Sequence, residues 1–274
     1  MTSAEGESEN HPVTFVADRL ARASWARVGL YSGCIAAAGF FTGTVLYLLD
    51  AMHALGESPE FHKTAAGPLH DEAVYWVGYF AHQHHILWDI IARDTLLPLA
   101  FLATIALSLA IANVLGWEQP AVQLMVAFFF VGGILALLAD LTFLAGTEYW
   151  RVTGWSTGNA AGMVAVGRSS AAVDTLTRWP EAAGFITLAF ALTLLGRLCR
   201  SGDPLPRRLG LLVNVEALLL AGTAISSAMQ ADNAYNIFSL LTGALVAPAV
   251  ALWLGLSLGQ PRGQREIVQP SPAK

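Results

Sequence analysis

Two histidines and an aspartate recur at helical spacing and could together do chemistry. His82, His85 and Asp89 are separated by three and four positions, so on a helix their side chains share one face. Two imidazoles and a carboxylate form a ligand set that a transition metal such as zinc or copper accepts. The spacing therefore predicts a candidate metal site, and no other feature of the sequence identifies a cofactor.

Other interpretations of this histidine pattern stay open. Asp89 could simply hydrogen-bond His85 across one helical turn, on a polar helix at the membrane interface. Imidazoles also titrate near neutral pH, so the same face could sense pH or contact a ligand. The metalloprotease pattern H-E-x-x-H is absent from the sequence, and no cysteine accompanies the histidines.

Two carboxylates, Asp140 and Glu216, lie inside long apolar stretches. Ionisable side chains at membrane depth are rare and are functional candidates by default. The alternatives are structural: Asp140 could bond to backbone or to Arg151, and Glu216 could extend toward Arg207 and Arg208. A relay of protons or cations between the two carboxylates is a third possibility.

The composition sets the environment in which these residues work. The chain has 274 residues, of which 55% are hydrophobic and only 13% charged, with a mean hydropathy of +0.53. Soluble domains carry about 25% charged residues, so this is a membrane protein. The net charge of −5 gives no electrostatic basis for binding nucleic acid.

Six apolar stretches are long enough to span a bilayer, which takes about 20 residues. They predict an all-α, polytopic bundle of six transmembrane helices. The stretches are Val28 to Leu49, Thr95 to Leu115, Ala121 to Ala145, Ala182 to Leu198, Leu209 to Met229 and Ile237 to Leu258, and the fourth could begin as early as Val173.

Basic residues predict the orientation, because Lys and Arg are enriched in cytoplasmic segments. With the amino terminus inside, ten of the fifteen basic residues lie on the inner side. We therefore expect a multi-pass protein of the cytoplasmic membrane with both termini cytoplasmic. Residues 1–26 form the N-terminal tail, 27–260 the transmembrane domain and 261–274 the C-terminal tail.

Two long outer segments, 51–94 and 146–179, interrupt the transmembrane domain. The first holds six of the seven histidines. Its residues 71–93 read as an amphipathic helix too short to span, which we place on the outer surface. Asp94 or Thr95 could cap the next helix, with Pro98 in its first turn, and this favours a break near Arg93. The rival is one kinked helix over 71–115.

Small residues predict close helix packing on the first span. Gly29 and Gly33, and then Gly39 and Gly43, are each four residues apart. Such pairs let helix backbones approach closely in lipid, either within the bundle or across a dimer interface. Pro248 on the last span is a candidate packing or kink position.

The outline of six spans, a long first outer loop and a closing Ala-Leu-Trp-Leu-Gly at 251–255 resembles a class of uncharacterised six-span bacterial membrane proteins, those assigned to domains of unknown function. The resemblance covers the architecture and this short motif. It implies a bacterial membrane protein and no particular activity.

No complete catalytic constellation occurs in the sequence, which favours a non-enzymatic protein. We expect it to present an outward-facing polar site to a partner protein, a lipid or a small ligand. The alternatives are a membrane metal protein or enzyme subunit using the outer His and Asp residues, and a small-solute or proton-coupled transporter using Asp140 and Glu216. The expected partners are the lipid bilayer and either another membrane protein or a second copy of the chain.

Overall fold

The computed structural model describes residues 12–56, 59–154, 159–201 and 205–259, with the side chains of 12–22 and 147–154 left out. Within these residues the chain is helical and contains no strand, as the sequence predicts. The helices are α1 (Pro12–Ala51), α2 (Pro68–His85), α3 (Leu87–Leu115), α4 (Pro120–Gly154), α5 (Ala160–Ser201), α6 (Arg207–Ala228), α7 (Asp232–Ser239), the π-helical segment η1 (Leu240–Val246) and α8 (Ala247–Gly259).

In the part of the chain that the structure describes, six helical segments are long and apolar enough to cross a membrane: α1, α3, α4, α5, α6 and the continuous run of α7, η1 and α8. They form a closed ring in which α1 packs on α3, α3 on α4, α4 on α5, α5 on α6, α6 on the α7–η1–α8 run, and α8 again on α1. Large apolar side chains such as Leu138, Phe190 and Leu218 face outward and are more than half exposed. This surface suits a lipid bilayer, because water would not tolerate so much exposed apolar area.

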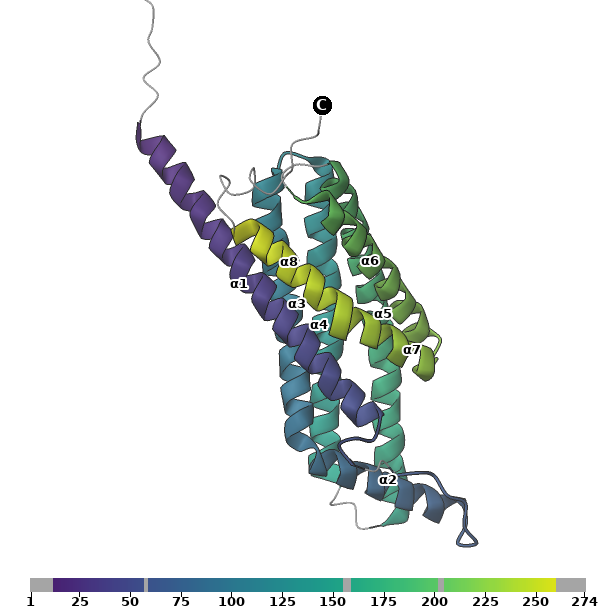
Figure 1. Cartoon of the computed structure of the whole chain (residues 1–274). Helices are drawn as coiled ribbons and strands as arrows, with labels where there is room; N and C mark the ends of the chain where they lie inside the picture. The colour runs from purple at the N-terminus through teal and green to yellow at the C-terminus, as the bar shows by residue number, and fades with distance from the viewer. Residues whose placement is uncertain (1–11, 57–58, 155–158, 202–204, 260–274) are drawn as a thin grey trace, which may run out of the picture.

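Helix α2 lies across one end of the bundle, and both described ends of the chain lie at the opposite end (Figure 1). The N-terminal tail predicted for 1–26 lies partly outside the described residues, but from Pro12 onward it is helical and continuous with the first span. The tail predicted for 261–274 lies entirely outside the described residues.

The break between the histidine helix and the next span is at Ile86, so the break predicted near Arg93 is wrong. Ile86 ends α2 with φ −94° and ψ 21°, and α3 begins at Leu87. Asp94 therefore caps nothing, and Pro98 lies inside α3 instead of in a first turn. An interior proline is tolerated in a membrane helix because neighbouring groups satisfy the carbonyl that it leaves free.

The fourth span is longer than predicted. Helix α5 runs from Ala160 to Ser201 and passes through Pro180 without a break. Together with the extension of α4 to Gly154, it turns most of the predicted outer segment 146–179 into continuous helix. These extensions of α4 and α5 project past the ends of α1 and α7 toward α2 (Figure 1).

The small residues of α1 pack against neighbouring helices of the same chain. A Cβ on Gly33 would lie 2.6 Å from the carbonyl oxygen of Ala251 and 2.7 Å from the Cα of Gly255, both on α8. A Cβ on Gly39 would lie 2.7 Å from the carbonyl oxygen of Leu96 on α3. Both crossings need glycine, because any side chain would meet backbone.

The last span contains an irregular turn where the sequence places a candidate kink. Segment η1 is π-helical and directly precedes α8, whose second residue is Pro248. Proline cannot donate to the carbonyl four residues back, and widening the helix is one way to accommodate that loss. The turn brings Gly243 so close to α1 that a Cβ there would overlap the hydroxyl of Thr44.

Candidate functional site

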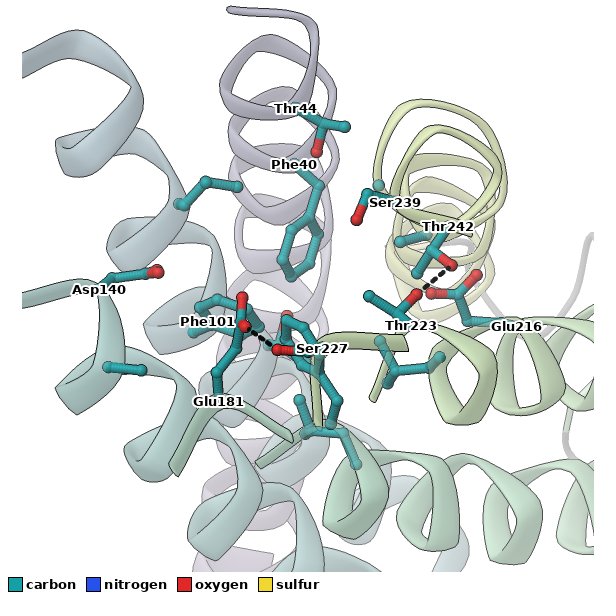
Figure 2. Close-up of a pocket in the computed structure, with 18 of the residues that line it drawn as sticks. Phe40, Thr44, Phe101, Asp140, Glu181, Glu216, Thr223, Ser227, Ser239 and Thr242 are labelled. Atoms are coloured by element: carbon teal, nitrogen blue, oxygen red, sulfur yellow. Dashed lines mark hydrogen bonds between the residues drawn. The ribbon is translucent and has the colours of Figure 1, made fainter. Parts of the chain in front are cut away.

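A cavity of about 280 Å³ runs through the middle of the ring, and all six spans contribute to its wall. Each helix supplies residues at steps of three and four, as Phe40, Thr44 and Tyr47 do on α1, because that spacing keeps side chains on one face. Figure 2 shows Asp140, Glu181 and Glu216 directed toward this space from α4, α5 and α6.

The cavity reaches the surface at the end of the bundle where α2 lies. Asp232, at the start of α7, lines it with a side chain that is 72% exposed. Deeper lining residues such as Ile111, Leu192 and Leu254 are apolar and buried. The cavity therefore has a polar mouth and a largely apolar interior.

Two arginines that line the cavity form ion pairs with aspartates. Arg93 on α3 is buried and donates to Asp94 through Nε at 2.6 Å and through Nη2 at 3.2 Å. Arg178 on α5 pairs with Asp174 at 3.3 Å and with Asp232 at 3.0 Å. Both arginines that line the cavity are thus already neutralised by carboxylates of the chain.

Glu181 is held in the mouth by hydroxyl groups. Ser227 of α6 and Tyr235 of α7 each donate to its carboxylate at 2.7 Å. Tyr47 of α1 donates to the side-chain oxygen of Asn236 at 2.8 Å. These bonds tie α5, α6, α7 and α1 together around the opening.

The two intramembrane carboxylates predicted from the sequence, Asp140 and Glu216, both line this one cavity. Glu216 is 3% exposed, and neither its Oε2 nor Asp140 Oδ2 has a hydrogen-bond partner among the described residues. Arg207 and Arg208 are exposed at the start of α6, and Glu216 faces the cavity instead of extending toward them. The Arg151 side chain, an alternative partner for Asp140, lies outside the described residues.

The three predicted metal ligands do not form a cluster. His82 is buried and bonds Asp50 at 3.1 Å, His85 is exposed, and Asp89 belongs to the first turn of α3, beyond the break at Ile86. The described part of the chain holds no group of three His, Cys, Asp or Glu side chains suited to a metal ion. An aspartate in a first turn has a simpler explanation, since it complements the positive end of the helix dipole.

Helix α2 is fixed over the bundle end by polar and aromatic contacts. Arg168 of α5 donates to both carboxylate oxygens of Glu72, at 2.8 and 2.7 Å, and these bonds lower the pKa of Glu72. The ring of Trp76 lies directly against Gly167 of α5. Burial, followed by the negative charge of Asp174, raises the pKa of Tyr79 to about 12.

Sequence reasoning missed Glu181, Asp174 and Arg178 as site residues. They stand just before the apolar stretch assigned to the fourth span, beside Trp179 and Pro180, which is a pattern typical of a helix start at the interface. A usable signal was the spacing of Asp174, Arg178 and Glu181 at four and three residues. It places all three on one face of a helix.

The lining of the cavity is acidic overall. Two arginines line it, against six carboxylates: Asp94, Asp140, Asp174, Glu181, Glu216 and Asp232. After the two arginine pairings, Asp140, Glu181 and Glu216 have no basic partner among the described residues that line the cavity.

Comparisons with known proteins do not suggest a function, so a functional proposal has to be based on the geometry of the cavity. No protein-family model, curated protein or solved structure matches the chain significantly.

Proposed function

We propose that the chain is a non-catalytic membrane protein that binds a small ligand in its central cavity, and that the ligand enters by the mouth beside Asp232 and Arg178. The observation that carries this proposal is the cavity itself: about 280 Å³, lined by every span, with a polar mouth and an apolar interior. Ligand pockets begin at about 300 Å³ and combine apolar walls with a few placed polar groups. The volume and lining suit one small amphipathic molecule.

The setting that we propose is a bacterial cytoplasmic membrane with both termini inside. The bias of basic residues toward the termini and the 197–208 connector supports this orientation, and so does the resemblance in outline to six-span bacterial proteins. In this orientation the cavity mouth and α2 face the extracytoplasmic side. The proposal does not include a metal, because the described residues hold no group of three His, Cys, Asp or Glu side chains suited to one.

A variant that fills the cavity tests the proposal. Ala139 lines the cavity and is 3% exposed, whereas the neighbouring Leu138 is 51% exposed on the outer face of the same helix. We expect small molecules that copurify with the protein in mild detergent, measured by native mass spectrometry and by extraction, to be lost in Ala139→Phe. They should be retained in Leu138→Phe. Equal recovery from both variants, or none from the unaltered protein, would contradict the proposal.

Transport of the same ligand is a second candidate, supported by the positions of the carboxylates along the bundle. Asp140 lies 20 residues into α4 and Glu181 lies 20 residues before the end of α5, whereas Glu216 lies nine residues into α6. At about 1.5 Å per residue, Glu216 is about 16 Å deeper than the other two. Flux into proteoliposomes that falls in both Asp140→Asn and Glu216→Gln would favour transport, and flux indifferent to both would exclude it.

A further inference from the structure

The deep part of the cavity, around Glu216, offers acceptors of hydrogen bonds. Glu216, Leu220 and Thr223 recur at four and three residues on α6 and all line the cavity. Glu216 is 3% exposed, and its Oε2 receives no hydrogen bond from the described residues. A carboxylate oxygen placed in this way needs a donor from outside the chain.

The hydroxyl groups near Glu216 have already used their hydrogens. Thr223 donates to the carbonyl oxygen of Leu219 at 3.1 Å, and elsewhere in the cavity wall Ser108 donates to that of Ile105 at 2.7 Å. Thr242 lies 3.4 Å from Thr223, and since the hydrogen of Thr223 is engaged, Thr242 is the donor of that pair. Each oxygen keeps lone pairs that can accept a hydrogen bond. In Figure 2 the Glu216 carboxylate points toward the hydroxyls of Thr223 and Thr242.

Among the residues that the structure describes, no positively charged side chain pairs with Glu216. Among the described residues, Arg93 and Arg178 are the basic side chains that line the cavity, and both are paired at the mouth. The same cavity wall includes Ile111 and Leu254, which are apolar and only 1% and 2% exposed. A buried carboxylate between apolar walls favours a cationic guest.

From this arrangement we propose that the deep end of the cavity binds the protonated amine of a small ammonium compound with an apolar body. The ammonium group carries three donors and no acceptor, which complements Glu216, Thr223 and Thr242. The apolar walls offer contact to a hydrocarbon body but few of the oxygen ligands that a bare metal cation requires. This inference rests on the proposed function and names its ligand class.

Three probes that differ in charge test the inference on the full chain in phosphatidylcholine nanodiscs. They are 2-phenylethylamine, which is protonated at neutral pH, its uncharged analogue 2-phenylethanol, and the anion phenylacetate. Calorimetric titration should show the amine binding at least tenfold more tightly than the alcohol, and phenylacetate binding most weakly. The shift in Tm that each probe causes gives a second, independent ranking of the three affinities.

Substitutions then test whether Glu216 and Thr223 cause the preference for the amine. Glu216→Gln removes the charge at nearly constant size, and we expect it to weaken amine binding at least tenfold while alcohol binding is unchanged. Retained alcohol binding shows that the cavity of this variant is intact. Thr223→Val should weaken amine binding several-fold. Glu118→Gln, a carboxylate change at the exposed α3–α4 turn, is the matched control and should bind as the unaltered protein does.

The outcomes separate this inference from the proposed function. If the alcohol or the anion binds as well as the amine, or if Glu216→Gln leaves the amine affinity unchanged, the inference is overturned. In that case, binding that Ala139→Phe blocks and Leu138→Phe does not would still uphold the proposed function. Failure of all three probes to bind would count against both.

Discussion

Asp50, near the end of the first span, accepts a hydrogen bond from Nε2 of His82 at 3.1 Å, and this contact joins α1 to α2. The other carboxylate oxygen of Asp50 lies 4.0 Å from Nη1 of Arg93 on α3. One aspartate of α1 therefore contacts both α2 and α3. His82, which the sequence predicts as a metal ligand, instead helps to hold α2 against α1.

Removing this contact should loosen α2 without unfolding the bundle. In His82→Ala the carboxylate of Asp50 loses the one hydrogen bond that it accepts from the described residues. Because the Asp50 side chain is 22% exposed, we expect a cost of about 1 kcal/mol, at the low end for an unpaired polar group. We expect faster amide hydrogen exchange in residues 68–85 and a lower Tm. His85→Ala, an exposed change on the same helix, should behave as the unaltered protein. Equal effects of the two substitutions would show that the Asp50–His82 contact does not hold α2.

The crossing of α1 with α8 should be sensitive to a single methyl group. In Gly33→Ala the new Cβ would lie within 2.7 Å of the α8 backbone at Ala251 and Gly255, and backbone cannot rotate away. Overpacking of this kind costs about 1–3 kcal/mol, so the Tm in detergent should fall.

Gly259→Ala is the matched control for this crossing. The atoms nearest to its Cβ would be those of the Leu30 side chain, at 3.4 Å or more, which is ordinary contact. A Gly33→Ala protein as stable as Gly259→Ala would mean that the helices cross farther apart than described.

The loop before α2 should loosen in acid. Both the side chain and the backbone N–H of Thr64 donate to Asp71, and these bonds hold the pKa of Asp71 below its ordinary value of 3.8. A lowered pKa in the folded state means that the stabilisation is fully present above that ordinary value. It is lost as the pH falls through the lower, folded-state pKa.

Hydrogen exchange of residues 59–71 measured against pH tests this expectation. Protection of these amides should be constant at neutral pH and should decline below about pH 4, the region where an unperturbed aspartate titrates. Thr64→Val removes the hydroxyl bond and should move the decline to higher pH. An unchanged profile in Thr64→Val would show that the Thr64 hydroxyl does not set the pKa of Asp71.

The spans could be predicted from the sequence because their signal is local: each is a long apolar stretch. The break at Ile86 could not, because Ile86 is an apolar residue with no helix-ending neighbour, and it is 2% exposed. Its conformation follows from the docking of α2 on Asp50, which is a tertiary contact. Conversely, Asp94 and Pro98 looked like a helix start, but Asp94 instead pairs with Arg93 inside α3.

The candidate site was also predictable only in part, because some of its features are local and others depend on tertiary contacts. Asp140 and Glu216 are conspicuous because they interrupt apolar stretches. Their convergence on one cavity depends on the ring order of the helices, which no local pattern gives. Glu181 escaped notice because it directly precedes the apolar stretch 182–198 that was assigned to the fourth span, whereas α5 begins at Ala160 and continues through Pro180.

The proposed orientation can be tested by labelling cysteines at the two ends of the bundle, in a Cys34→Ser/Cys199→Ser background. Ala65→Cys lies in the exposed loop before α2, and Ser201→Cys lies at the exposed end of α5. Neither substitution alters the charge bias that sets topology. A membrane-impermeant maleimide should label Ala65→Cys in intact cells and should label Ser201→Cys only after permeabilisation. The reverse labelling pattern would mean that the mouth of the cavity opens to the cytoplasm. The ligand would then have to come from inside the cell.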